Sequence, residues 1–481
     1  MTACKMNPDV PLCVDLDGTL TYSDTLHESA LQQIRARPVA VCAWPFWLMQ
    51  GKAVLKQRIA ANACLDVTIL PYNEVFLAWL RQQRAAGRRL VLCTAADYSV
   101  AQAVAVHLGV FDEVIASDGT INLAGSNKAR ALVARFGEKG FDYAGNARPD
   151  LKVWQHARRA VVVNADTALI ECARAQCEIE QVFAPRVQGV TVWRRVFRFH
   201  QWLKNLLLLV PMLAAHQLTD SGDWWRLLLA FLSFSFSASA VYIMNDLLDI
   251  ESDRHHPRKR YRPFAAASVS VPAGVLLVPF LLAVSGGLGV MVGTAFVQWL
   301  LVYLVVTASY SFVLKRLVLI DCLVLAGLYT LRVIAGAAAV GLPLSFWLLA
   351  FSVFLFFSLA FVKRFAELLL MHADETGQIR GRGYHREDAP LIGMLGVAAG
   401  YASVLVLALY LQSEAVRALY ATPEWIWGAV PVLLFWISWL WLQAHRGRMD
   451  DDPMVFAIRD RVSLGASAVF CMMLILGTLQ W

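Results

Sequence analysis

The sequence predicts two domains: a cytosolic α/β domain with a doubly wound parallel sheet, and then an all-α transmembrane bundle of about nine helices. Of the 481 residues, 58% are hydrophobic and 16% are charged, which is too apolar for an ordinary soluble enzyme. Charged residues are frequent up to about residue 200, and long apolar runs dominate after it. We therefore expect residues 1–195 to form the first domain and residues 196–481 to form the second.

The opening segment MTACKMNPDVPLCVDLDG lacks the long apolar core of a secretory signal, so we expect the first domain to remain in the cytosol. The nine cysteines include no C-x-x-C pair, which favours reduced, packed thiols over a disulfide framework or a zinc site. The net charge of +7 gathers beside apolar runs, as membrane-topology signals do. This charge therefore does not indicate a nucleic-acid partner.

Three short apolar segments of the first domain are typical of buried strands. PLCVDLDGT contains Asp15 and Asp17, RRLVLCTAA contains Thr94, and VFDEVIASD follows after the helical pattern DYSVAQAVAVHLG. Strands that alternate with helices predict a parallel sheet, in which ligands bind at the carboxyl ends of the strands. Both polar motifs lie at such ends, so we expect them to contribute to one site.

The D-x-D-G-T motif, Thr94, Lys128 in GSNKARAL and GNARPD at 145–150 occur in the order found in the haloacid dehalogenase (HAD) superfamily of phosphatases, which the chain resembles over roughly residues 9–170. The resemblance implies that Asp15 is a nucleophile that forms an aspartyl-phosphate. It also implies that Asp17 protonates the leaving alcohol and then activates water. Thr94 and Lys128 would hold the phosphoryl oxygens.

The same resemblance implies a Mg²⁺ site made by Asp15, the Asp17 carbonyl, Asn146 and Asp150. Where the family usually has Gly-Asp, this chain has Gly145 and Asn146, which removes one negative charge from the metal site. Asp150 would then be the acid that the fourth motif supplies. The alternative is a degenerate phosphatase kept as a soluble scaffold. Residues between Asp24 and about Gly87 would form a cap over the site.

The second domain contains apolar runs long enough to cross a bilayer, which takes roughly 20 residues. We expect spans at 202–218, 227–248, 271–290, 292–313, 318–340, 345–363, 389–411, 426–443 and 463–480. The loops after the second, fourth, sixth and eighth spans carry most of the Lys and Arg, including the segment 363–386. By the positive-inside rule these loops face the cytosol, and the C-terminus lies outside.

The segment NDLLDIESDRHHPRKRYRP follows the second of these apolar runs. Asn245, Asp249 and Asp253 are spaced four residues apart, so a helix would project all three from one face. Oxygen ligands of this kind suit a divalent cation, and Mg²⁺ usually completes its coordination with substrate phosphates. The following Arg and Lys residues suit phosphate oxygens. The pattern therefore indicates a diphosphate site at a membrane surface.

N-D-x-x-D-x-x-x-D at the end of the second span resembles the UbiA-type intramembrane transferases over roughly residues 195–481, and YSFVLKR with Tyr310 and Lys315 resembles a basic element after their fourth helix. Ordinary prenyl-diphosphate members carry a second group of aspartates near the sixth helix. The corresponding stretch of this chain has a different set: Asp321, Tyr329, Arg332, Lys363, Arg364 and Glu367. A site in which cations replace carboxylates favours direct binding of anionic oxygens.

The segments RFHQWLKNLLLLVP, NDLLDIESDRHHPRKRYRPFAA and YTLRVIAGAAA are similar to one UbiA subgroup, the decaprenyl-phosphate phosphoribosyltransferases. This resemblance implies phosphoribosyl pyrophosphate as the donor and a polyprenyl phosphate as the acceptor, with Mg²⁺ as the cofactor. The implied metal and pyrophosphate ligands are Asn245, Asp246, Asp249 and Asp253. The implied phosphate and substrate contacts are Lys204, Arg254, Lys259, Arg262, Tyr310, Lys315, Tyr329, Arg332, Lys363 and Arg364.

A phosphoribosyl lipid would carry a 5-phosphate, so we hypothesise that the phosphatase-like domain removes it. One alternative is a prenyltransferase that moves an isoprenyl chain from its diphosphate to an aromatic or other acceptor. Another is a non-catalytic lipid-phosphate transporter with a regulatory domain. Charges at a helix end can also serve only as a topology anchor, and Arg332 could simply pair with Asp321. Three carboxylates on one helical face at membrane depth favour a functional site, because charges in a bilayer are costly.

Overall fold

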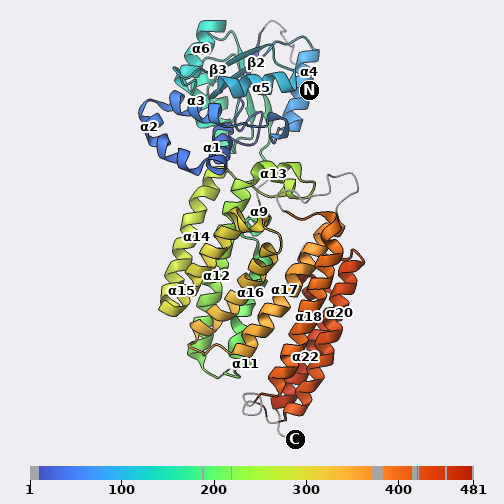
Figure 1. The fold of residues 1–481 in the computed structure, drawn as a ribbon. Coiled ribbons are helices and arrows are strands. Elements are labelled where there is room, and N and C mark those ends of the chain that lie inside the picture. The colour runs from blue at the N-terminus through green and yellow to red at the C-terminus, as the bar shows by residue number, and fades with distance from the viewer. Residues whose placement is uncertain are drawn as a thin grey trace. The chain divides into compact units, whose positions relative to one another are not determined.

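The computed structural model describes residues 10–186, 189–217, 219–370, 383–413, 420, 422–449 and 452–478 (Figure 1). The chain divides into two compact units. The first contains Met1–Phe197 and Ile243–Val278, and the second contains Arg198–Tyr242 and Pro279–Trp481. The phosphatase-like motifs and the acidic motif that starts at Asn245 therefore belong to the same unit.

The first unit contains a parallel six-stranded sheet with the strand order β3-β2-β1-β4-β5-β6. Its strands are β1 (Leu12–Val14), β2 (Leu90–Asp97), β3 (Glu113–Ser117), β4 (Asp142–Gly145), β5 (Arg159–Val163) and β6 (Glu178–Phe183). Every residue of β1 is buried, as expected for a central strand covered on both faces. The predicted doubly wound α/β domain is confirmed.

Helices lie between the strands of this sheet along the chain, and one follows the last strand. They are α1 (Thr25–Ala36), α2 (Trp44–Met49), α3 (Lys52–Asn62), α4 (Glu74–Ala85), α5 (Tyr98–Leu108), α6 (Ser126–Phe136), α7 (Leu151–Trp154), α8 (Thr167–Arg174) and α9 (Val190–Phe197). Four 3-10 turns belong to the unit: η1 (Pro38–Ala43), η2 (Val67–Ile69), η3 (Arg148–Asp150) and η5 (Lys259–Tyr261). The short helix α13 (Ile250–His255) carries the second half of the acidic motif.

The expected cap is shorter than the sequence suggested. The segment from α1 to η2 is helical and lies outside the sheet, but α4 is part of the core, because Phe76 and Leu80 pack in one cluster with Leu12 and Val14 of β1. Asp24 begins the insertion by capping α1, since its carboxylate accepts from the N–H groups of the first turn. The cap therefore ends before α4 and does not extend to Gly87.

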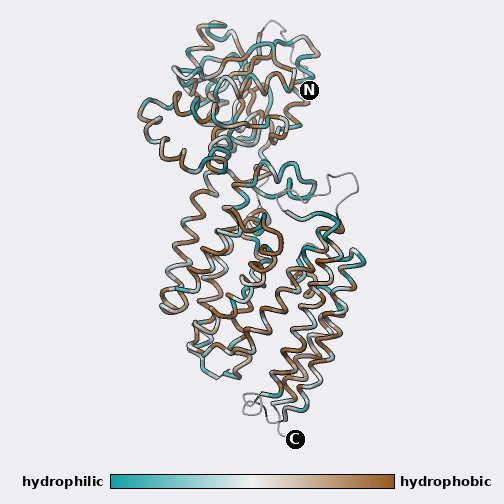
Figure 2. The backbone as a smooth tube through the Cα atoms, viewed as in Figure 1, coloured by the Kyte–Doolittle hydropathy of each residue, from teal (hydrophilic) through white to brown (hydrophobic). Residues whose placement is uncertain are grey.

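The second unit is helical and mostly hydrophobic (Figure 2). It contains α10 (Phe199–Trp202), η4 (Leu203–Leu209), α11 (Val210–Ala214), α15 (Thr294–Phe312), η6 (Leu314–Arg316), α16 (Ile320–Ala339), α17 (Phe346–Leu369), η7 (Arg386–Asp388), α18 (Ala389–Leu411), η8 (Pro423–Gly428), α20 (Ala429–His445), α21 (Pro453–Arg459) and α22 (Arg461–Thr478). Two long helices, α12 (Ser221–Leu248) and α14 (Val271–Val292), have residues in both units.

Within the described residues, eight helices are long and apolar enough to cross a membrane. They correspond to eight of the nine expected spans, so the chain is a multi-pass integral membrane protein. The remaining one, at 202–218, is divided among α10, η4 and α11, with Pro211 in the first turn of α11.

The sixth expected span ends later than the sequence suggested. Helix α17 continues to Leu369, so Lys363, Arg364 and Glu367 lie in the helix and not in the following loop. Arg364 pairs with Glu367 one turn away and with Asp321, which balances its charge inside the protein. Residues 371–382 of the expected loop lie outside the described residues.

Candidate active sites

The strand register brings the HAD-like motifs to one edge of the sheet. Val14, the last residue of β1, pairs with Leu92 of β2 and with Ala144 of β4. The next residue, Asp15, donates its N–H to the Ala144 carbonyl over 3.0 Å, and its own Oδ1 accepts from the N–H of Leu16 over 2.9 Å. Parallel strands in this register place Asp15 level with Cys93 of β2, which precedes Thr94, and with Gly145 of β4.

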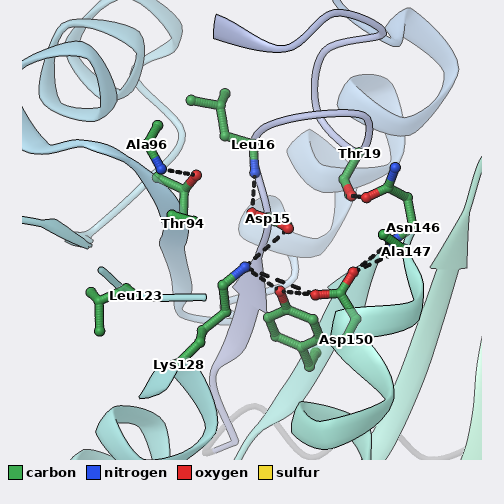
Figure 3. Close-up of polar contacts among 12 residues, drawn as sticks. Asp15, Leu16, Thr19, Thr94, Ala96, Leu123, Lys128, Asn146, Ala147 and Asp150 are labelled. Carbon is green, nitrogen blue, oxygen red and sulfur yellow. Dashed lines mark hydrogen bonds and ion pairs between the residues drawn. The ribbon is translucent and has the colours of Figure 1, made fainter. Parts of the chain in front are cut away.

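Lys128 connects the two acidic motifs of this site (Figure 3). Its ammonium lies 3.0 Å from Asp15 Oδ2 and 3.9 Å from Asp150 Oδ1. It also donates to the Tyr143 hydroxyl over 2.7 Å, and that hydroxyl donates to Asp150 Oδ1 over 2.9 Å. Backbone N–H groups of Asn146 and Ala147 donate to the other Asp150 oxygen. Asp150 is thus held in one orientation, facing the same cation as Asp15.

Burial shifts the protonation equilibria of these groups. It raises the pKa of Asp15, and the nearby Lys128 ammonium opposes that rise. Burial, followed by the charge of Asp24, raises the pKa of Asp17 to about 7. Burial works against the charged form of Lys128, but Asp15 and Asp150 together raise its pKa above the usual value. A carboxyl group that titrates near neutral pH is suited to both donating and accepting a proton.

Asp17, Thr94 and Asn146 also lie where the motif order predicted. Asp17 Oδ1 accepts from the N–H of Thr25 over 2.8 Å at the start of the cap. The Thr94 hydroxyl oxygen accepts from the Ala96 N–H over 3.1 Å, and Asn146 Oδ1 accepts from the Thr19 hydroxyl over 3.2 Å (Figure 3). The amide of Asn146 therefore occupies the place where a carboxylate would add a charge.

Gly18 leaves room for that amide. The φ of Gly18 is +75°, and a Cβ at this position would lie 2.1 Å from Asn146 Nδ2. No side chain fits there without displacing Asn146, and a positive φ favours glycine in any case. The glycine of D-x-D-G-T is thus required by both the turn and the close approach.

Two residues of this site were not identified from the sequence. Tyr143 was missed because an aromatic residue in the strand DYAG is indistinguishable from a core residue. Lys56 of α3 was missed because its helix gives no sign of facing the sheet. Its ammonium donates to the Ala95 carbonyl over 2.7 Å and to Asn122 Oδ1 over 3.0 Å, so a cap lysine reaches the residue after Thr94.

The acidic motif that starts at Asn245 remains helical across the junction of α12 and α13. Asp249 donates its N–H to the Asn245 carbonyl over 2.9 Å, and Asp253 donates to the Asp249 carbonyl over 2.8 Å. The predicted i, i+4, i+8 spacing is therefore preserved. Asp249 itself has φ −102° and ψ 11°, which marks the junction.

Asp246 and Asp253 share a cation. Arg262 Nη1 lies 3.1 Å from Asp246 Oδ1 and 2.8 Å from Asp253 Oδ2, and both carboxylates are buried. Burial raises the pKa of Asp253, and Arg262 counteracts this effect. Two oxygen ligands seven residues apart thus converge on one positive charge. Asp246, which the resemblance placed among the implied metal ligands, is one of the pair.

Two further cations near this motif pair with carboxylates. Arg254 forms a double hydrogen bond with Glu28 of α1, at 2.6 and 2.7 Å, so its guanidinium is not open to a phosphate as expected. Asp249 Oδ1 lies 3.6 Å from Arg35 Nη2 at the end of the same helix. The partners Glu28 and Arg35 are more than 200 residues away in the sequence, and no local pattern could have identified them.

Arg332 and Lys204 of the second unit are buried among aromatic and polar side chains. Arg332 donates to Asn205 Oδ1 over 2.9 Å and to the Tyr303 hydroxyl over 3.2 Å, so it does not pair with Asp321. Lys204 pairs with Asp452 and lies 5.6 Å from the centre of the Tyr329 ring. Arg332 also lies over the Tyr329 ring, which brings three predicted residues together.

Asp452 was missed because acids in a loop are usually exposed, whereas its side chain is buried against Lys204. Arg364 is fully buried between Asp321 and Glu367, and Tyr384 bonds to the same Asp321. Arg364 was predicted to contact phosphate, but in the structure it pairs with these two carboxylates instead. Lys363, by contrast, is half-buried and forms no ion pair with any described residue.

The remaining predicted residues are scattered. Tyr310 and Lys315 are half-buried at the end of α15 and in η6. Lys259 is exposed in η5. Nowhere in the described ranges do three His, Cys, Asp or Glu side chains form a ready-made metal cluster.

The oxygen donors at both sites nevertheless suit a hard cation, since Asp15 and Asp150 face one ammonium and Asp246 and Asp253 face one guanidinium. In each pair, two carboxylates already share a positive charge. By donor type these carboxylate oxygens fit a magnesium ion, and Lys128 and Arg262 balance their charge in this structure.

Two family models match the chain. The model of the UbiA prenyltransferase family matches residues 207–464, and that of haloacid dehalogenase-like hydrolases matches residues 12–153. A solved UbiA homologue from Archaeoglobus fulgidus, bound to GPP and Mg²⁺, aligns with 59% of this chain and 99% of its own at 15% identity and a TM-score of 0.44.

Curated relatives resemble both halves. The protein y4nM of Sinorhizobium fredii is 38% identical over 94% of this chain and 88% of its own. The nodulation protein NoeC of Azorhizobium caulinodans is 37% identical over 56% of this chain and 87% of its own. A decaprenyl-phosphate phosphoribosyltransferase of Mycobacterium tuberculosis is 32% identical over 59% of this chain and 92% of its own.

Proposed function

Because the chain belongs to the UbiA prenyltransferase family and carries a haloacid dehalogenase-like hydrolase domain, we propose that it makes a lipid-linked ribose in two steps. In the first step, the 5-phosphoribosyl group of phosphoribosyl pyrophosphate is transferred to a polyprenyl phosphate and pyrophosphate is released. In the second step, the HAD-like domain removes the 5-phosphate. The similarity to the mycobacterial phosphoribosyltransferase over nearly its whole length supports the first step.

The observation that carries the proposal is the cluster of cations and tyrosines in the second unit. Lys204, Tyr329 and Arg332 lie together, and Asn205 and Tyr303 orient the Arg332 guanidinium. The Arg332 guanidinium donates to the uncharged groups of Asn205, Leu328 and Tyr303, whereas the Lys204 ammonium already pairs with Asp452. Arg332 is therefore the cation of this cluster that best suits phosphate oxygens. A donor with a 5-phosphate and an acceptor with a terminal phosphate present more anionic groups than one metal site neutralises.

The transfer forms a bond between the sugar C1 and an oxygen of the lipid phosphate, and it breaks the bond between C1 and the pyrophosphate oxygen. Asn245, Asp246, Asp249 and Asp253 would hold Mg²⁺, which would stabilise the negative charge that develops on the leaving pyrophosphate. Arg262, already between two of these acids, adds a further cation. The lipid phosphate is anionic, so the step needs no strong general base.

The hydrolysis begins with attack of the Asp15 carboxylate on the 5-phosphate. Asp17 protonates the departing 5-oxygen of the sugar as its bond to phosphorus breaks, and then takes a proton from the water that cleaves the aspartyl-phosphate. Lys128 neutralises the phosphoryl oxygens from its position beside Asp15. Mg²⁺ held by Asp15, the Asp17 carbonyl, Asn146 and Asp150 would offset the charge of the phosphate as the nucleophile approaches. Both steps would take place on the cytosolic face of the membrane.

The test uses the full chain in detergent with Mg²⁺ and measures pyrophosphate release. We expect release only when phosphoribosyl pyrophosphate and a polyprenyl phosphate are both present, and its loss in Asp249→Ala. Glu424→Gln, which removes an exposed carboxylate, is the matched control. Release that instead requires an isoprenyl diphosphate with an aromatic acceptor would establish the prenyltransferase and refute the proposal.

A further inference from the structure

An apolar segment of the cap lies at the surface of the first unit. It consists of η1 and α2, residues Pro38–Met49, with the sequence PVAVCAWPFWLM, and none of its residues is buried. Val39 is 81% exposed, Phe46 is 64% exposed and Met49 is 85% exposed. It is also an apolar helical segment too short to cross a bilayer. Contiguous exposed apolar side chains of this size usually mark an interaction site.

The composition of this apolar segment suits the boundary between lipid headgroups and acyl chains. Trp44 and Trp47 are half-buried, and the Trp44 indole N–H donates to Gln33 Oε1 of α1 over 3.2 Å. Tryptophan is enriched at membrane interfaces because its ring is apolar while its N–H is polar. Phe46, Leu48 and Met49 add exposed side chains without polar atoms on the same short helix.

The charge around the apolar segment also suits a membrane surface. Residues 29–65 contain no Asp or Glu. Their cations are Arg35, Arg37, Lys52, Lys56 and Arg58. Lys52 and Arg58 of α3 are exposed close to the apolar segment. A basic surface beside an exposed apolar one is attracted to anionic lipid headgroups.

A second, independent observation relates the apolar segment to a candidate membrane span. It follows α1 directly, and the last turn of α1 contacts the end of a membrane-spanning helix. Arg35 Nη1 donates to the Leu248 carbonyl over 3.3 Å, and Leu248 is the last residue of α12. All these residues belong to the first unit. Pro38 is thus three residues from a side chain that binds the end of α12, one of the candidate membrane spans.

We propose that the apolar segment Pro38–Met49 inserts into the headgroup region of the bilayer and anchors the cap of the HAD-like domain on the membrane surface. The occupant of this surface is the lipid itself. The proposal depends on neither of the two activities. Its consequence is that the phosphatase site is held next to the bilayer, where a lipid-linked substrate presents its polar end.

The experiment places a photoreactive benzoylphenylalanine at position 46 of the full chain in lipid nanodiscs that contain anionic lipids. Phe46→benzoylphenylalanine keeps an aromatic side chain at an exposed position, so we expect the protein to fold. After irradiation, mass spectrometry should find lipid attached to the peptide that contains position 46. The matched control is Val106→benzoylphenylalanine, because Val106 is 72% exposed on α5 of the same domain. It should show no lipid adduct above background.

Two results would overturn the proposal. If positions 46 and 106 give equally little lipid adduct, the apolar segment faces water. If position 46 instead crosslinks to a second copy of the chain, protein covers this surface and not lipid. A second measurement repeats the reaction with Lys52→Glu and Arg58→Glu, and we expect the adduct at position 46 to decrease in anionic nanodiscs. An unchanged yield would contradict the electrostatic part of the proposal.

Discussion

The HAD-like site and the acidic motif are both rich in carboxylates, but their charges are balanced in different ways. In the HAD-like site, Lys128 meets Asp15 and Asp150 because neighbouring strands end at one edge of the sheet. In the acidic motif, Asp246 and Asp253 meet Arg262 from the following loop. A parallel sheet thus assembles its site by register, whereas a helix end relies on cations brought by loops.

A comparison of these two sites shows which interactions a short motif can predict. Strands that alternate with helices predict a parallel sheet whose carboxyl ends share one edge, so distant motifs of the HAD-like domain are expected to converge. Charges at the end of a membrane span must be neutralised by whichever partners the fold supplies. The following predictions separate the two sites, starting with the largest expected effect.

The strongest test of the HAD-like site is Asp15→Asn. It removes the nucleophile without changing the shape of the side chain, so hydrolysis of the 5-phosphate should fall by on the order of 10⁴-fold or more. Phosphate release from the phosphoribosyl lipid measures this, and pyrophosphate release should remain unchanged. Glu171→Gln on the exposed face of α8 serves as the control. Equal loss of both activities would show that the two sites are not independent.

The acidic motif is tested by Asp253→Asn. Asp246 and Arg262 would remain, but one negative charge of the proposed metal site would be lost, so transferase activity should fall by about 10²-fold. When pyrophosphate release is assayed at increasing Mg²⁺ concentration, the variant should bind the ion more weakly and need more of it for half-maximal activity. Hydrolysis of added phosphoribosyl lipid should stay normal. A transferase with unchanged Mg²⁺ dependence would remove Asp253 from the proposed ligands.

The substitution Asn146→Asp restores the charge that the HAD-like site lacks. We expect the Mg²⁺ concentration for half-maximal phosphatase activity to fall by about tenfold, because an added carboxylate strengthens the binding of a hard cation. Titration of phosphatase activity with Mg²⁺ measures the change. The opposite result, weaker activation by Mg²⁺, would mean that the hydrogen bond from Thr19 to Asn146 matters more than the charge.

The smallest effect is expected for Tyr143→Phe. The Tyr143 hydroxyl links Lys128 to Asp150. Its removal leaves the Lys128 ammonium and the Asp150 carboxylate in place, so phosphatase kcat should fall by only several-fold. Phe136→Leu, at a nearby partly buried position on α6, controls for packing. If kcat is unaffected, the ion pair between Lys128 and Asp15 alone orients the site.

Much of the fold and of the HAD-like site could be predicted from the sequence. The three strands, Asp15, Asp17, Thr94 and Lys128 follow from patterns that are local and ordered along the chain. The eight apolar helices follow from composition. Tyr143 could not be found, because its hydroxyl acts while its ring packs in the core as any aromatic residue does.

The pairings near the acidic motif and in the second unit were harder to predict. Arg254 and Arg364 were expected to contact phosphate, but each pairs with carboxylates that lie elsewhere in the sequence or fold. Burial of an arginine requires such partners, and the sequence does not show which acids provide them. For the same reason Asp452 could not be recognised as the partner of Lys204.

A time course of lipid products shows whether one chain carries out both steps. The full chain is incubated with Mg²⁺, a polyprenyl phosphate and phosphoribosyl pyrophosphate, and the masses of the lipid products are measured by mass spectrometry. We expect a phosphoribosyl lipid to appear first and to be converted to a ribosyl lipid, and we expect it to accumulate in Asp15→Asn. A phosphoribosyl lipid that persists equally in both proteins would contradict the second step, and the absence of any ribose-containing lipid would contradict the first.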